Sequence, residues 1–221
     1  MEICRLEHVK KEYRMGETVC PLKDVNMSVN SGDFIAVEGV SGTGKSTLLS
    51  VMGLLLEKDG GSYTFDGKDT AGLSDDEKTD IRAKKIGFLF QDTNLIQALT
   101  LRENLLFAQT LGGSRAADEK KADAMLDKLG LIDRAGFLPY QLSGGQRRRA
   151  MAARCLIHSP ELILADEPTN DLDDEWAAKV VELLAEAAQK GAGVVMVTHN
   201  SRWTAAAALK YKMQNRELIK I

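Results

Sequence analysis

The chain contains one glycine-rich stretch that restricts its fold more than any other part of the sequence. Gly39 and Gly44 are separated by four residues and are followed by Lys45 and Ser46, a spacing typical of loops that cradle phosphate. Glycines let the backbone curl so that successive N–H groups face one anion, and a following helix adds the positive end of its dipole. We expect Lys45 to place its charge on the outer phosphates and the Ser46 hydroxyl to ligate Mg²⁺. The predicted phosphate-contacting residues are Gly39, Ser41, Gly42, Thr43, Gly44, Lys45, Ser46 and Thr47.

The residues on either side of this loop decide between two interpretations. The alternative to phosphate binding is a glycine-rich turn that carries a surface lysine. However, residues 33–38 read as a strand and residues 47–56 read as a buried helix. Because a phosphate loop requires a strand before it and a helix after it, we favour phosphate binding.

Composition limits the classes of protein to consider. The chain has 221 residues, 44% hydrophobic and 28% charged, which is ordinary for a soluble globular protein of one well-buried domain or two small ones. A net charge of −3 argues against a nucleic-acid-binding face as the main function. The three cysteines are widely spaced, which favours a reducing, cytosolic compartment. The apolar stretch around residues 48–56 is too short to span a bilayer, so any membrane role must come through a partner.

The order of the predicted elements indicates an α/β fold. Residues 3–14 and 19–29 read as two strands joined by a turn, which predicts an antiparallel pair. Later helices alternate with short buried strands, which predicts a mostly parallel sheet covered on both faces. Residues 92–142 carry helical periodicity and read as a helical insertion. Further strands are predicted at 62–65, 86–90, 162–165, 194–197 and 210–221, and further helices from Ser74 and at 101–111, 116–129, 146–157, 174–190 and 201–209.

Two acidic residues follow a buried strand late in the chain. Asp166 and Glu167 come directly after the apolar residues 162–165, and ligands bind open α/β sheets at the carboxyl ends of their strands. The alternative is a strand that ends in a solvated acidic turn. Because a phosphate loop precedes these acids, we predict that Asp166 holds Mg²⁺ through water. We predict that Glu167 orients or deprotonates the attacking water.

A second glycine-containing stretch, Ser143-Gly144-Gly145-Gln146, precedes a predicted helix. One interpretation is a plain helix start with Ser143 as the N-cap. The other is a second phosphate site, built from the serine hydroxyl, backbone N–H groups and the helix N-terminus. One chain does not need two phosphate cradles for one nucleotide, but two chains that complete each other's sites do.

Five ordered motifs then resemble those of the ATP-binding subunit of an ABC transporter, over almost the whole chain. They are the phosphate loop, Gln91 after an apolar strand, residues 142–146, the acidic pair with the following Pro168-Thr169, and His199. The resemblance implies a single nucleotide-binding domain over residues 1–221. Its expected fold is a P-loop NTPase core with a mostly parallel sheet, an N-terminal antiparallel β subdomain and an inserted helical subdomain. The expected activity is hydrolysis of ATP with Mg²⁺.

The resemblance also implies roles that local sequence does not. Gln91 is expected to contact Mg²⁺ and the attacking water, and His199 the γ-phosphate. Tyr13 is expected to stack on adenine, although on local sequence it reads as a strand-edge aromatic. Two copies of the chain would hold ATP between the phosphate loop of one and residues 143–146 of the other, and a separate transmembrane permease would contact residues 92–142. The dimer would then lie at the cytoplasmic face of the inner or plasma membrane, with no nucleic acid as partner.

Two segments indicate a branch within this family. Residues 46–54 and 88–104 resemble the lipoprotein-release and macrolide-export branch. Asn170-Asp171 and Asn200 depart from the usual residues near the dimer interface, and neither removes a catalytic group. Two alternatives stay open. One is the ATPase of a membrane-linked cell-division regulator, and the other is a soluble ABC protein that acts as an ATP-dependent clamp.

The remaining polar residues of note have no motif partner. We expect His8 and His158 to be structural or surface residues. Arg147, Arg148 and Arg149 are consecutive on a predicted helix, so they point in different directions. A solvated or salt-bridged helix end is the expectation for them.

Overall fold

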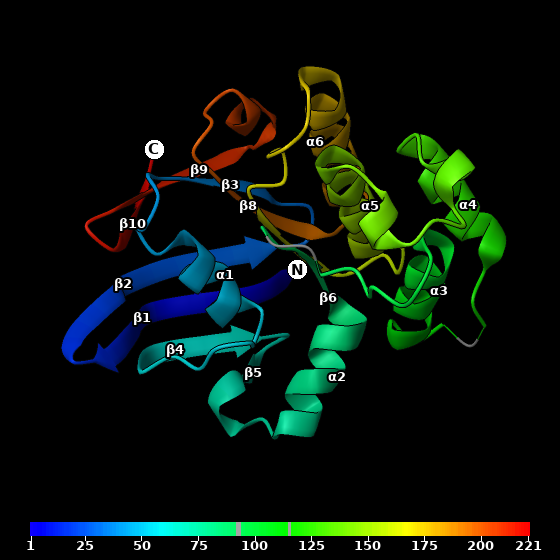
Figure 1. Cartoon of the computed structure of the whole chain (residues 1–221). Coiled ribbons are helices and arrows are strands. Elements are labelled where there is room, and N and C mark those ends of the chain that lie inside the picture. The colour runs from blue at the N-terminus through cyan, green and yellow to red at the C-terminus, as the bar shows by residue number, and fades with distance from the viewer. Residues whose placement is uncertain (92–93, 115) are drawn as a thin grey trace.

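The computed structural model describes residues 1–91, 94–114 and 116–221, with the side chains at 14, 15 and 17 outside the description. In this part of the chain ten strands form a sheet in the order β5-β4-β1-β2-β10-β9-β3-β8-β7-β6 (Figure 1). The strands are β1 Glu2–Met15, β2 Glu17–Asn30, β3 Phe34–Glu38, β4 Gly60–Phe65, β5 Lys68–Asp69, β6 Ile86–Leu89, β7 Leu162–Asp166, β8 Gly193–Thr198, β9 Leu209–Gln214 and β10 Glu217–Lys220.

The helices lie between these strands in the sequence. The α-helices are α1 Lys45–Met52, α2 Asp75–Lys85, α3 Leu101–Leu111, α4 Glu119–Lys128, α5 Gly144–Leu156 and α6 Asp174–Gln189. Short 3-10 segments are η1 Thr70–Gly72, η2 Ile132–Arg134, η3 Pro139–Gln141 and η4 Trp203–Ala206. No helix in the described ranges is long and apolar enough to cross a bilayer.

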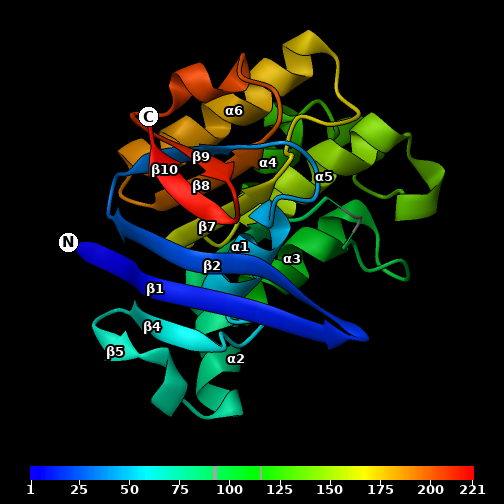
Figure 2. The same ribbon diagram turned by 90° about the vertical axis from the view of Figure 1, so that its left-hand side faces the viewer.

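The sheet has an antiparallel half and a parallel half, as predicted. The long strands β1 and β2 pair antiparallel and run side by side with β4 (Figure 2). Strands β3, β8, β7 and β6 pair parallel to one another. Between the halves, β10 pairs with β2 through the single register pair Glu217 and Asp24, next to a hydrogen bond from Lys23 N to Arg216 O of 2.9 Å. This narrow contact between β2 and β10 is the seam of the sheet.

Alternate residues of the parallel strands face two apolar cores. Ile35 and Val37 of β3 pack with α1 and the antiparallel strands, and Phe34 and Ala36 pack with α5 and α6 on the other face. Both sets are buried because helices or strands cover each side, so these strands read as continuous apolar runs. Burial of one such side chain contributes about 1.5–3 kcal/mol. These two cores therefore support the carboxyl ends of the parallel strands, where the loops of the candidate site begin.

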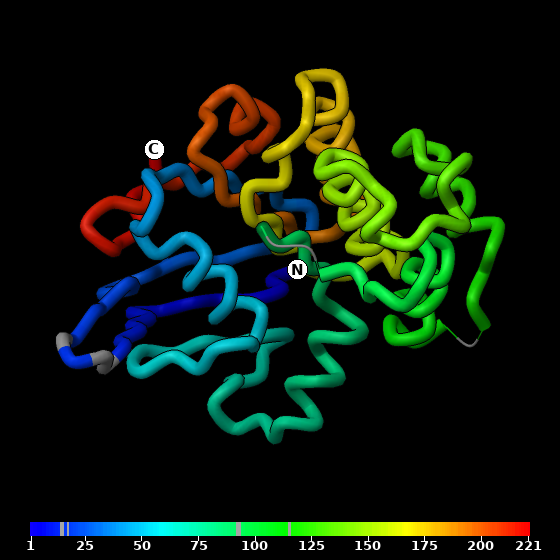
Figure 3. Tube along the Cα trace, in the orientation of Figure 1, coloured from blue at the N-terminus to red at the C-terminus, as the bar shows by residue number. Residues whose placement is uncertain are grey.

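Helices α3 and α4 form the predicted helical insertion, on the side of the molecule opposite β4 and β5 (Figure 3). Thr100 caps α3 in a capping box with Glu103, so the helix begins where predicted. The buried Asn104 side chain accepts a hydrogen bond from Ile96 N at 2.8 Å and donates to Leu99 O at 3.0 Å. This contact fastens the loop before α3 to the helix.

Three predicted helices are shorter in the structure. The helix expected over residues 116–129 spans only Glu119–Lys128, and Asp118 caps its start. The other two differ where distant parts of the chain meet. The helix expected over residues 47–56 ends at Met52, and the Gly53 that follows lies against the Phe88 ring, where any Cβ would overlap it. Leu54 then adopts a left-handed φ of 56°. The helix expected over residues 201–209 is only the 3-10 turn η4, since Leu209 already pairs with β3.

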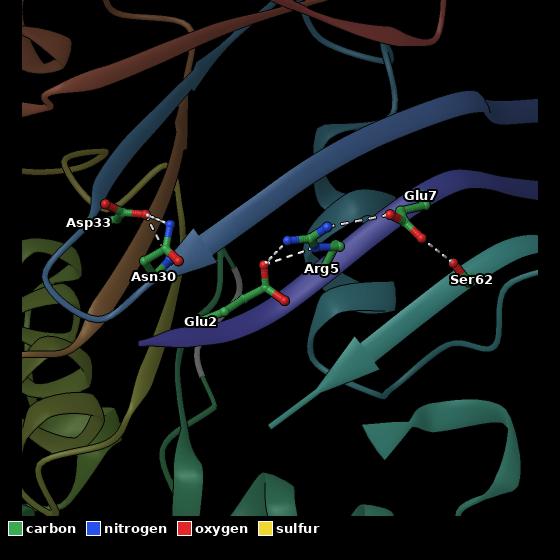
Figure 4. A network of polar contacts seen from close by, with 6 residues as sticks. All are labelled: Glu2, Arg5, Glu7, Asn30, Asp33 and Ser62. Atoms are coloured by element: carbon green, nitrogen blue, oxygen red, sulfur yellow. Dashed lines mark hydrogen bonds and ion pairs between the residues drawn. The ribbon is translucent and has the colours of Figure 1, made fainter. Parts of the chain in front are cut away.

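The turn before the phosphate loop strand is fixed by polar contacts. Asp33 Oδ2 accepts hydrogen bonds from Asn30 N at 2.7 Å and from Asn30 Nδ2 at 3.0 Å (Figure 4). On β1, Arg5 lies between Glu2 and Glu7, as the same figure shows. These exposed ion pairs contribute about 0–1 kcal/mol each, whereas the Asn30–Asp33 contact sets where β3 begins.

Candidate functional site

The phosphate loop follows β3 and ends where α1 begins. Gly42 and Gly44 have φ of 78° and 106°, and a Cβ at Gly44 would overlap the Pro21 carbonyl oxygen. Glycine is therefore required at Gly44 by both conformation and space. The Lys45 side chain is only 7% exposed, and its Nζ donates to Gly39 O at 2.6 Å and to Val40 O at 3.0 Å. Since an ammonium has three donors, one remains for a phosphate oxygen at the mouth of the loop.

The sheet register brings the two predicted acids to this loop. Glu38 of β3 pairs with Thr198 of β8, and Asp166 of β7 pairs with Val197. The carboxyl ends of the three strands therefore meet at one edge of the sheet. Asp166 and Glu167 are 6% and 7% exposed there, which excludes the alternative of a solvated acidic turn.

Glu167 is held in place by His199. The Glu167 Oε1 atom lies 2.9 Å from His199 Nδ1, and Glu167 Oε2 accepts a hydrogen bond from His199 N at 3.3 Å. Glu167 N also donates to Val197 O at 3.0 Å, with Glu167 in the left-handed region at a φ of 47°. The carboxylate is thus oriented by two contacts with His199 and its backbone by a third with Val197, while more than half of the His199 side chain stays exposed.

Asp166 faces the phosphate loop. Burial raises the pKa of its carboxyl above the ordinary value, and the hydrogen bond from the Ser46 hydroxyl and the charge of Lys45 oppose that rise. A buried carboxylate next to a hydroxyl gains from a cation between them. The described residues contain no cluster of three or more His, Cys, Asp or Glu side chains suited to a metal. A cation at Asp166 would therefore take its other ligands from Ser46, Gln91, water and a phosphate.

These side chains line one cleft of about 280 Å³. It contains most of the residues predicted for the site, although Gly39 and Thr43 of the phosphate loop are not among its lining residues. It also contains Pro21, for which the sequence gives no signal, and Asn170, which the resemblance placed only near the dimer interface. The lining residues are Pro21, Ser41, Gly42, Gly44, Lys45, Ser46, Thr47, Gln91, Asp166, Glu167, Asn170 and His199.

Two groups of predicted residues lie away from this cleft. Tyr13 is on β1, paired with Val19, and its ring centroid lies 5.7 Å from Lys11 Nζ. Ser143 caps α5: its Oγ accepts from Gln146 N at 3.3 Å, and Gln146 Oε1 accepts from Ser143 N at 2.9 Å. Gly144 and Gly145 continue this helix start, and none of residues 143–146 lines the cleft of the same chain.

The expectation of a solvated or salt-bridged helix end for the three arginines is confirmed only in part: Arg148 lies 3.8 Å from Asp171 Oδ2, but it is not solvated, and Arg147 donates to Leu142 O. Arg148 is 5% exposed and donates to the carbonyl oxygens of Phe90 and Gln91. Arg149 stacks on Trp176 with its Cζ 3.9 Å from the ring centroid and donates to Leu129 O. The sequence gives no signal for these roles, because the acceptors are backbone carbonyls.

The two other histidines have the surface and structural roles that were expected. His8 is exposed, with Nδ1 2.9 Å from Asp24 Oδ1. His158 packs its ring against Gly112, and neither of its buried ring nitrogens has a hydrogen-bond partner in the described residues. Burial lowers the pKa of His158, which keeps the ring neutral.

Comparison with known proteins agrees with the resemblance seen in the motifs. The chain matches the family described as ABC transporter over residues 22–170. It is 39% identical over 221 residues to the macrolide export ATP-binding/permease protein MacB of Aggregatibacter actinomycetemcomitans, covering 99% of this chain and 34% of that protein. It is 37% identical over 217 residues to the pyoverdine export ATP-binding/permease protein PvdT of Pseudomonas fluorescens, covering 97% of this chain and 33% of that protein. The chain thus spans about a third of the length of these relatives.

The fold also matches solved structures. The post-hydrolysis dimer of the ATP-binding cassette MJ0796 bound to ADP and Pi has a TM-score of 0.93 and 36% identity, covering 99% of this chain and 98% of that one. A second dimeric structure of MJ0796, described as a bacterial ABC transporter cassette, has a TM-score of 0.92 and 36% identity, covering 98% and 96%. With the family matched over more than half of its length, this chain belongs to the ABC transporter family.

Proposed function

We propose that this chain is the ATP-hydrolysing subunit of an ABC transporter or of an envelope complex that transmits motion, and that residues 1–221 act as one nucleotide-binding domain. The observation that carries the proposal is the convergence of Lys45, Asp166, Glu167 and His199 on one cleft. A phosphate loop, a buried carboxylate pair and a histidine at one sheet edge are the parts that phosphoryl transfer to water requires.

Each side chain then has a role in that reaction. The backbone N–H groups of the phosphate loop and Lys45 bind the phosphates, and Tyr13 stacks on the adenine ring. Glu167, oriented by His199, accepts a proton from the attacking water, while His199 contacts the γ-phosphate. Gln91 positions the same water. Catalysis on this scheme is mostly positioning and charge stabilisation.

The donor set fits Mg²⁺. Ser46, Gln91 and Asp166 offer a hydroxyl, an amide oxygen and a carboxylate, all oxygen ligands of the kind that Mg²⁺ takes alongside phosphates and water. Their side chains line the same cleft. When bound, the cation would offset phosphate charge.

The position of Ser143 supports a dimer of two copies arranged head to tail. Ser143 is exposed and the first residues of α5 are half-buried, and none of residues 143–146 lines the cleft at the chain's own phosphate loop. A helix N-terminus of this kind binds anions. We therefore place residues 143–146 of each chain on the nucleotide held by the other chain, so that closure of the dimer completes both sites.

A disulfide crosslink tests this arrangement. In a chain whose three native cysteines are replaced, Ser41→Cys and Ser143→Cys should crosslink between chains when ATP is present, and much less without it. A matched control pairs Ser41→Cys with Ser114→Cys, in the loop after α3, and should stay uncrosslinked. A crosslink within one chain, seen on a denaturing gel as a shifted monomer, would show that the head-to-tail arrangement is wrong.

We further propose that a helix of a separate membrane permease docks beside the helical insertion, within residues 92–142, at the cytoplasmic face of the membrane. Next to this segment a groove lies between α2, α3 and α5, and its charged lining residues are Arg82 and Arg154, with no acid among the described ones. Burial lowers the pKa of Arg154, and its Nε has no hydrogen-bond partner in the described chain. A carboxylate on the permease helix would offset this cost.

The exposed face of α3 offers a test of docking. Leu111 lines the groove and is 45% exposed, and Phe107, one turn earlier, is 42% exposed. A Phe107→Asp, Leu111→Asp chain should keep its ATPase rate within about twofold but lose at least tenfold in recovery of its transmembrane partner from detergent-solubilised membranes. Val19→Asp, on an exposed strand end, is the control. Equal recovery with both variants would place the docking site elsewhere.

A further inference from the structure

Arg148 lies one turn into α5, the helix that begins at Ser143, and its guanidinium is buried. Its Nη1 donates to Phe90 O at 2.6 Å and its Nη2 donates to Gln91 O at 2.7 Å. The fork of the guanidinium thus holds two successive carbonyls of the segment that carries the Gln91 side chain into the cleft. A planar bidentate contact of this kind fixes orientation as well as distance.

The same guanidinium faces a second loop of the site. Its Nη2 lies 3.8 Å from Asp171 Oδ2, in the segment that follows Glu167. That segment also packs on the start of α5, because a Cβ at Gly145 would come within 2.8 Å of Asp171 O. Asn170 N in turn donates to Glu167 O at 3.2 Å. Arg148 therefore contacts both loops that leave the cleft, one from Gln91 and one from Glu167.

The Arg148 side chain is also buried, at 5% exposed. Side chains that are buried, bidentate and charged resist displacement, since moving a guanidinium away from its acceptors leaves it and them unpaired. A shift of α5 must therefore either carry the Gln91 segment with it or break these hydrogen bonds.

We propose that Arg148 is a positioning residue that couples the two nucleotide sites of the dimer. This rests on the proposed function, in which Ser143 acts on the nucleotide of the partner chain. Closure of α5 on that nucleotide moves Arg148, and Arg148 moves Gln91 and the Asp171 loop in the chain's own site. Occupancy of one site thereby sets the geometry of water attack at the other.

Cooperativity of ATP hydrolysis tests the coupling. The wild-type chain should show a Hill coefficient clearly above 1, approaching the number of coupled sites. Arg148→Gln should lower kcat about tenfold or more, because Gln91 loses its support, and reduce the Hill coefficient to about 1. Binding of a fluorescent ATP analogue to the monomer should change by no more than about twofold, since Arg148 does not line the cleft. Arg148→Lys keeps the charge without the fork and should recover part of kcat but not the Hill coefficient.

Arg149→Gln is the matched control. Arg149 is the next residue of α5 and also donates to a backbone carbonyl, but it contacts Leu129 and Trp176, away from the cleft. Its loss should lower the melting temperature while the Hill coefficient stays at the wild-type value. A reduced Hill coefficient in Arg149→Gln equal to that in Arg148→Gln would show general loosening of α5 and overturn the proposal.

Two further outcomes would also overturn it. The first is a wild-type Hill coefficient of about 1, and the second is an unchanged Hill coefficient in Arg148→Gln and Arg148→Lys chains that melt cooperatively. Failure of the proposed function is separate, because it would be seen first as absence of ATP hydrolysis by the wild-type chain.

Discussion

A Lys45→Ala chain is expected to lose ATP turnover by about 10²–10³-fold or more and to bind nucleotide more weakly. Lys45 is 7% exposed, and its ammonium donates to the carbonyl oxygens of Gly39 and Val40 in the phosphate loop. Its charge acts where negative charge gathers on the transferred phosphoryl group. Without it, binding loses a charge-assisted contact and hydrolysis loses charge stabilisation.

Steady-state release of phosphate and titration with a fluorescent nucleotide measure the two effects of Lys45→Ala separately. Lys68→Ala, in the exposed strand β5, is a matched control that removes a lysine far from the cleft. It should behave as wild type. Hydrolysis by Lys45→Ala at the wild-type rate would mean that this loop is not the phosphate site.

Glu167→Gln is expected to retain ATP but lose hydrolysis by about 10²–10⁴-fold, the contribution of a positioned general base. The substitution keeps the size of the side chain and an oxygen near His199, but an amide does not accept the proton of the attacking water. Because ATP then persists in both sites, the closed dimer should persist too.

Size-exclusion chromatography with Mg-ATP should therefore show a stable Glu167→Gln dimer where the wild-type chain returns to monomer as it turns over. Glu161→Gln is the control, because Glu161 is exposed just before β7 and pairs with Lys85. Wild-type turnover by Glu167→Gln would remove Glu167 from the role of base. Loss of ATP binding instead would point to a structural role beside His199.

Much of the site could be predicted because its functional residues belong to short local motifs. The phosphate loop, Asp166, Glu167 and His199 each occur at the end of a strand with a recognisable apolar pattern, and the parallel register then brings those ends together. Helix α3 was predicted at its observed bounds because its apolar periodicity begins and ends at turn residues.

The parts that could not be predicted depend on contacts between distant segments. α1 ends early, at a left-handed Leu54 that follows the approach of Gly53 to Phe88, and no local pattern indicates this contact. The burial of Arg148 was not predicted, because its acceptors are the backbone carbonyls of residues 90 and 91, and every residue has a carbonyl. Whether Tyr13 reaches adenine and Ser143 reaches the partner's nucleotide stays a prediction, since each lies outside the cleft of its own chain.

The seam between β2 and β10 has a mechanical consequence. The strands on either side of it are joined to their neighbours by ladders of directional hydrogen bonds, but across the seam the described register is one residue pair. At the seam the two halves of the sheet are held together mainly by the apolar core that they share, and apolar contacts are non-directional and tolerate sliding. The sheet is therefore stiff within each half, and the two halves can slide past each other more easily at the seam. Tyr13 belongs to the antiparallel half of the sheet and Lys45 follows a strand of the parallel half. A nucleotide that contacted both residues would therefore restrict movement of the two halves across the seam.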